Sequence, residues 1–211
     1  MARALSTLGS VSEAAAPSLV RLVTHDDMAV KNAAALALQG IGLTSVESVL
    51  ALVDARESAT DELRNVIDKA IEATNTSVMP QLERRLRAAS SDSERLRLVI
   101  GVRLVGQSYS PLIPSLLELC TSDSMRIASE AELALSIVGP PGTDEIQTLL
   151  QALTHPNSRI KTQSLKVLAP LGAHVPEIPP AAASLVQDKD PAVRTEARTA
   201  LKKMQDKGVD H

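Results

Sequence analysis

Residues that could do chemistry are few in this chain of 211 residues, and they are scattered along it. His25 and His155 stand six residues before Lys31 and Lys161, so they occupy one repeated loop position and are not a metal pair. No cysteines and histidines have the spacing of a zinc site, and no glycine-rich segment has the spacing of a phosphate-binding loop. We therefore expect no metal site, no cofactor and no enzymatic activity.

Arginines are the one dense group of functional side chains. They gather in one twenty-residue stretch of the sequence: Arg84, Arg85, Arg87, Arg95, Arg97 and Arg103. Such a basic surface could hold phosphates or an acidic partner peptide. The alternative is a solvated helix face with local ion pairs to neighbours such as Asp92 and Glu94.

The elements that must position these residues repeat along the chain. One apolar residue begins each repeat pattern at intervals of 33, 33, 31, 33 and 33 residues: Val30, Leu63, Leu96, Ile127, Ile160 and Val193. Apolar or small residues recur four, seven and eight positions after these anchors, with Arg103 as the one exception, which places them on one face of an α-helix. Ten residues before each anchor lies a second apolar segment. The pattern therefore predicts a stack of helix pairs.

Short polar segments separate the two helices of each predicted pair. They are His25–Asp27, Ser91–Ser93, Ser122–Ser124 and Asp188–Pro191, and their Asp and Ser side chains can cap the second helix. Glycines stand twelve residues past the anchors at Gly42, Gly139 and Gly172, where the helix is expected to stop.

The segment from Asp188 to Leu201, with its Asp-Pro, Val-Arg and Ala/Leu pattern, resembles the second half of a HEAT repeat. The short period is similar to that of the phycobilisome-lyase-type HEAT-like repeats. This resemblance implies an all-α fold, a right-handed α-α superhelix (HEAT/armadillo-like solenoid) of about six helix pairs. It also implies that a basic residue after each anchor bonds to loop aspartates, in a ladder formed by Lys31, Arg64, Arg97, Lys161 and Arg194.

The prediction for domain organisation is a single solenoid over residues 1–211. Its units are 1–9 (partial), 10–42, 43–75, 76–108, 109–140, 141–173 and 174–206, with a tail at 207–211. The first nine residues align with the end of a second helix, so Leu5, Leu8 and Val11 are expected near an open N-terminal edge. Upstream repeats or self-association could cover that edge, and fraying is the alternative.

The third repeat departs from the pattern and supplies the candidate partner-binding residues. Leu98, Val102 and Val105 form an apolar stripe opposite the expected core face, where other repeats are polar or mixed. Arg97 and Arg103 flank it, and Arg103 stands in a column that otherwise holds Ala or Val. The stripe is either an exposed peptide-binding patch or the buried face of a rotated helix that turns Arg103 outward.

Composition limits where in the cell the protein is expected and which classes of partner it is expected to bind. The net charge of −3 gives no general attraction to nucleic acid or anionic membrane. The sequence has no apolar run long enough to span a bilayer and no leader-like N-terminus, which favours the cytoplasm. Cys120, the single cysteine, falls in an apolar column and is expected to be a buried structural thiol. The core must be built from Leu, Ala, Val and Ile, because Tyr109 is the only aromatic residue.

These observations favour a non-catalytic scaffold that presents a concave helical surface to another protein or peptide. One alternative is a phycobilin-lyase-like accessory or chaperone subunit, which would need a pocket for a chromophore. Another is a HEAT-like DNA-binding protein of the glycosylase type. Base flipping usually relies on stacking aromatic residues, which this chain lacks, so nucleic acid is the weaker expectation.

Overall fold

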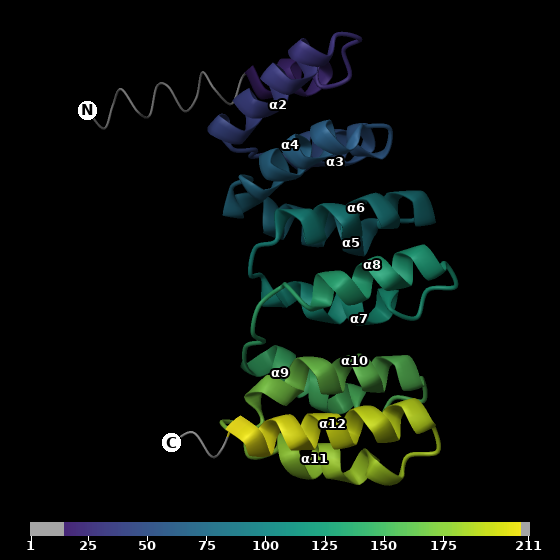
Figure 1. Ribbon diagram of the computed structural model, residues 1–211. Helices are drawn as coiled ribbons and strands as arrows, with labels where there is room; N and C mark the ends of the chain where they lie inside the picture. The colour runs from purple at the N-terminus through teal and green to yellow at the C-terminus, as the bar shows by residue number, and fades with distance from the viewer. Residues whose placement is uncertain (1–14, 208–211) are drawn as a thin grey trace, which may run out of the picture. The chain divides into compact units, whose positions relative to one another are not determined.

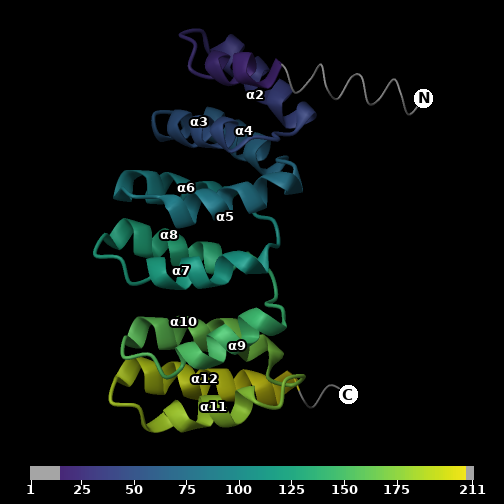
Figure 2. The ribbon, with the colours of Figure 1, turned by 180° about the vertical axis from the view of Figure 1, so that it is seen from behind.

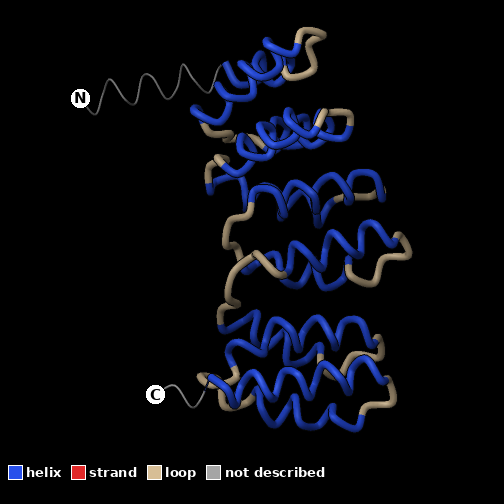
Figure 3. Tube along the Cα trace, viewed as in Figure 1, coloured by secondary structure: helices blue, strands red, loops and turns tan. Residues whose placement is uncertain are grey.

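A computed structural model describes residues 15–207, and all regular secondary structure in that range is helical (Figures 1 and 3). The predicted all-α architecture of paired helices is therefore confirmed. The chain divides into two compact units, residues 1–107 and 108–211. The single solenoid with its unit boundaries stays a prediction, and Leu5, Leu8 and Val11 lie outside the described residues.

The described part of the first unit, residues 15–107, contains three helix pairs, and consecutive second helices lie side by side, α2 against α4 and α4 against α6. The pairs begin with a helix at 15–22 and continue with α2 (Met28–Ile41), α3 (Val46–Glu57), α4 (Asp61–Glu72), η1 (Thr76–Val78), α5 (Met79–Ala88) and α6 (Asp92–Val105).

The second unit also contains three pairs within residues 108–207, and its last two second helices, α10 and α12, lie side by side (Figure 2). Helix α8 packs mainly on its own partner, α7. The elements are η2 (Ser110–Leu112), α7 (Ile113–Leu119), α8 (Met125–Leu135), α9 (Thr143–Ala152), α10 (Ser158–Leu168), η3 (Ala169–Leu171), α11 (Ile178–Ser184), η4 (Leu185–Gln187) and α12 (Pro191–Lys207).

The polar loops cap the second helices through a repeated two-step arrangement. The backbone N–H of Asn157 donates to Nδ1 of His155 at 3.0 Å, and the Asn157 side chain accepts from the N–H of Arg159 at 2.8 Å. His25 and Asp27 make the same contacts in the first repeat, at 3.0 Å and 2.7 Å. Asp188 and Asp190 make them before α12. The capping role predicted for these loops is confirmed, and both histidines serve as loop acceptors.

Of the three glycines predicted to stop second helices, only Gly42 directly follows one. It caps α2 with φ of +74°, where a Cβ would lie 3.0 Å from the carbonyl oxygen of Ala73. The stops predicted at Gly139 and Gly172 come too late, since α8 and α10 each end four residues before the glycine. Gly172 has an ordinary φ of −62°, and the place of a Cβ there is filled by Met204, so this glycine serves close packing.

Some of the basic residues that follow the anchors bond to loop groups, as the resemblance implies. Arg194 donates to the carbonyl oxygens of Asp188 and Lys189 in its own loop, at 2.8 Å and 3.0 Å. Lys161 reaches the next repeat and donates to Asp188 Oδ2 at 2.6 Å. This hydrogen bond, followed by one from the Asp190 N–H, lowers the pKa of Asp188. Arg97 departs from the ladder, because it pairs with Asp54 within helix α3.

Candidate functional site

The apolar stripe predicted as an exposed patch is buried. Leu98, Val102 and Val105 expose 0%, 1% and 3% of their surface, so the interpretation as a docking patch on the third repeat is wrong. The alternative, a rotated helix that buries the stripe and turns Arg103 outward, holds in part: the stripe is buried and Arg103 is half-buried. Ile100 and Leu104 on the expected core face are buried as well, so α6 is covered on both faces and is not rotated.

Gly101 explains why this face of α6 is buried. A Cβ on Gly101 would lie 3.3 Å from Val49 Cγ1 and 3.9 Å from Leu82 Cδ2. The backbone of α6 therefore lies close against α3 and α5 at this point. Leu98 and Val105 stand three residues before and four residues after Gly101, on the same helix face, and are buried with it.

The arginine-rich stretch is largely neutralised by ion pairs within the first unit. Arg85 bridges Glu47 and Glu94 at 2.8 Å and 3.2 Å. Further pairs join Arg87 to Glu83, Arg95 to Asp92 and Arg97 to Asp54. The interpretation as a helix face with local ion pairs fits these contacts. A partner-binding role for Arg97 and Arg103 stays a prediction.

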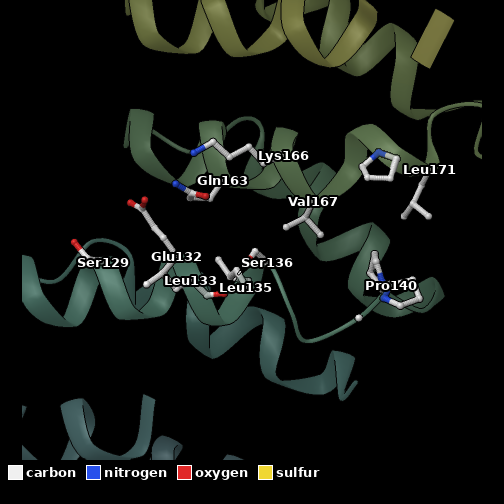
Figure 4. Close-up of a pocket in the computed structure, with 13 residues that line it drawn as sticks. Ser129, Glu132, Leu133, Leu135, Ser136, Pro140, Gln163, Lys166, Val167 and Leu171 are labelled. Carbon is white, nitrogen blue, oxygen red and sulfur yellow. Dashed lines mark hydrogen bonds between the residues drawn. The ribbon is translucent and has the colours of Figure 1, made fainter. Parts of the chain in front are cut away.

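A groove in the second unit is the candidate site, and it was not predicted. It has a volume of about 780 Å³ and lies between α8 and α10, with the loop after α8 at one end (Figure 4). Its lining is mostly apolar: Ser129, Glu132, Leu133, Leu135, Ser136, Gly139, Pro140, Pro141, Gln163, Lys166, Val167, Pro170 and Leu171.

Helix α8 contributes an exposed apolar side chain to this groove. Leu133 is exposed by 53% and lines the groove. Met125 and Ile137 are exposed too, but neither lines the groove, and Ile137 follows the end of α8. The sequence does not single out the position of Leu133, because the residue six positions after the anchor is apolar in three repeats (Leu36, Val102 and Leu133) and polar in the other three (Lys69, Lys166 and Thr199).

Polar groups on the α10 wall have no partner of their own. Gln163 is only 5% exposed, yet its side chain lines the groove and makes no hydrogen bond within residues 15–207. Lys166, one helical turn further, is exposed and makes no ion pair in the same range. Glu132 on the α8 wall is already paired, since it accepts from Arg159 Nε at 2.6 Å. The groove thus offers an apolar floor, one uncommitted amide and one uncommitted positive charge.

The other candidate reactive group is buried. Cys120 is fully buried behind the same helices, as predicted. Burial, followed by the negative charge of Glu132, raises the pKa of the thiol to about 12. A thiol in that state is protonated and shielded, which is the reverse of an activated nucleophile. Within the part of the chain that the structure describes, no three His, Cys, Asp or Glu side chains group as metal ligands would. No helix in that part has the length and apolar character to cross a membrane.

Comparisons with known proteins complete the description. No family model and no curated protein matches the sequence. Among solved structures, human deoxyhypusine hydroxylase in complex with glycerol is similar, with 19% identity, a TM-score of 0.45 and coverage of 94% of this chain and 77% of that one.

Two designed proteins are also similar in structure. One is an engineered protein with 19% identity and a TM-score of 0.43, covering 93% of this chain and 99% of its own. The other is a designed armadillo repeat protein in complex with the peptide (KR)4, with 16% identity and a TM-score of 0.42, covering 89% of this chain and 98% of that one. At these identities and TM-scores, the likenesses say nothing of what this protein binds.

Proposed function

We propose that this protein is a non-catalytic interaction module that binds a peptide segment of another protein in the groove between α8 and α10. One observation carries the proposal: Leu133 exposes 53% of its surface into a groove of about 780 Å³. Leaving a large apolar side chain in water forgoes the free energy of burying it, and exposed apolar patches typically mark interaction sites.

The lining supports binding better than catalysis. Its titratable groups are Glu132 and Lys166, and Glu132 is held by Arg159. A binding site for a peptide needs apolar contact area and a few placed polar groups, and the groove has both. Catalysis would in addition need a nucleophile or a base activated by a neighbour, and the lining supplies no such pair.

The test is a selection of random short peptides displayed on phage against the full-length protein, followed by measurement of Kd with the synthetic peptides. We expect binders whose affinity falls at least about tenfold for Leu133→Asp, because a charge would enter the apolar floor of the groove. The helical circular dichroism of the variant is expected to be unchanged, since the side chain is largely exposed in the folded protein.

The chain offers a matched control. Leu36 stands in the same repeat position on α2 and exposes 56% of its surface, but it does not line the groove. Leu36→Asp should therefore leave the affinity unchanged. The proposal fails if no peptide is selected, or if the two variants weaken binding equally.

A further inference from the structure

The α10 wall of the groove indicates which peptides it accepts. Resting on the proposed function, we propose that the occupant is an extended apolar segment with an acidic side chain, recognised by Gln163 and Lys166. These two residues stand three positions apart on α10 and so present their side chains on one face toward the groove (Figure 4).

Gln163 argues for an extended backbone. The residue is 5% exposed, and its amide, with two donors and one acceptor, makes no hydrogen bond in the described residues. Its polar atoms are not among those that are both buried and unpaired, so they reach the groove. A ligand that covered this amide without pairing it would leave it buried and unsatisfied, at a cost in free energy, so a ligand that pairs it is favoured. An extended peptide supplies free backbone N–H and C=O groups along its length, whereas a helix has already used most of its own.

Lys166 argues for an acidic side chain. The opposite wall holds one carboxylate, Glu132, and Arg159 already neutralises it at 2.6 Å. The charge that remains unmatched in the groove is therefore positive. A carboxylate placed against Lys166 would form a charge-assisted hydrogen bond of the strength of an exposed ion pair, because Lys166 is exposed.

The length of the site fits a short motif. Along α8 the lining runs from Ser129 to Ser136, which is about 10 Å at the rise of an α-helix. An extended chain covers this distance with about three residues. The motif we propose is thus one acidic residue within about three positions of an apolar residue that contacts Leu133 and Val167.

The experiment uses the same phage-displayed peptides, which are fused at their carboxyl end, so any carboxylate must come from a side chain. Against the native protein we expect Asp or Glu enriched at a fixed spacing from an apolar residue. Lys166→Glu should weaken those peptides by about tenfold, because a lost attraction and a new repulsion are each worth up to about a fivefold change. The Lys166→Glu protein should itself select Lys or Arg at the same position.

Two controls separate the possible results. Lys202→Glu makes the same charge change on α12, away from the groove lining, and is expected to leave affinity and selection unchanged. Gln163→Leu should weaken all selected peptides alike, since it removes a contact to backbone. Peptides that depend on Leu133 but lack an acidic position would overturn this inference and leave the proposed function standing. A loss of binding to Lys202→Glu equal to that of Lys166→Glu would also overturn it, and a failure to select any peptide would overturn both.

Discussion

At the scale of single residues, the same kind of residue serves different ends according to its burial and its neighbours. His25 and His155 accept loop N–H groups, and the arginines of the third repeat are paired with nearby carboxylates. Gln163 and Lys166 line the groove without partners in the described chain. An unpaired buried oxygen also occurs away from the groove, in Asn32, Thr74, Gln107 and Ser164. An unmatched polar group therefore marks a candidate site only where it lines a groove.

Cys120 gives a prediction at this scale. In the folded protein the thiol stays protonated up to a pKa of about 12, whereas the unfolded thiol ionises above its ordinary value of 9.0. The unfolded state therefore releases the proton first, and the free energy of unfolding falls as the pH rises from about 9 towards 12. The contribution of this one group is about 1.4 kcal/mol per pH unit within that window.

The measurement compares urea unfolding of the native protein and Cys120→Ala at neutral pH and above pH 9. Other groups also titrate there, so the quantity of interest is the difference between the two proteins. That difference should shrink as the pH rises, because the alanine variant has no thiol to ionise. A difference that stays constant up to the highest pH at which both proteins fold would contradict the assignment.

At the scale of elements, the caps can be tested one at a time. Asn157→Ala removes the acceptor for the Arg159 N–H at the start of α10 and should cost about 1 kcal/mol of stability. Asn157→Asp keeps an acceptor and adds a negative charge at a helix N-terminus, so it should be neutral or stabilising. Thermal or urea unfolding of the two variants measures both effects. Equal destabilisation by both would show that the side-chain acceptor is unimportant.

The orientation of α6 gives a second prediction for an element. Because Leu98 is fully buried, Leu98→Ala should destabilise the protein by about 2–5 kcal/mol. Leu133→Ala removes the same atoms from an exposed position and should change stability by no more than about 0.5 kcal/mol. Urea unfolding of the two variants distinguishes these cases. Similar small effects for both would mean that the stripe on α6 is exposed after all.

The sequence was sufficient to predict the helix pairs, because each repeat carries the same apolar spacing and the same capping residues. It was insufficient for the face of α6, since the close approach at Gly101 depends on the position of Val49 in another repeat. The comparison of equivalent repeat positions distinguishes Val102 but not Leu133, although both stand six residues after an anchor. Whether an apolar residue in that column is buried depends on the spacing of the helices, which the repeat pattern does not encode.

At the scale of the whole molecule, the candidate groove belongs to one of the two compact units. Every residue that lines the groove lies in residues 108–211. A chain consisting of these residues is therefore expected to bind the selected peptides with the same Kd as the full protein. Calorimetric titration of both chains measures this, with circular dichroism to establish that the shorter one is helical. A helical fragment that fails to bind would mean that residues 1–107 contribute to the site.

A core built mainly of Leu, Ala, Val and Ile, in a chain whose single aromatic residue is the half-buried Tyr109, has an optical consequence. The protein contains no tryptophan and so emits almost no light when indole is selectively excited. A tryptophan in a bound peptide would be the sole emitter in the mixture, and its emission would shift to the blue as the ring left water for the apolar floor beside Leu133. The composition that leaves the fold without large aromatic contacts thus allows the fluorescence of a bound peptide to be measured with almost no background from the protein.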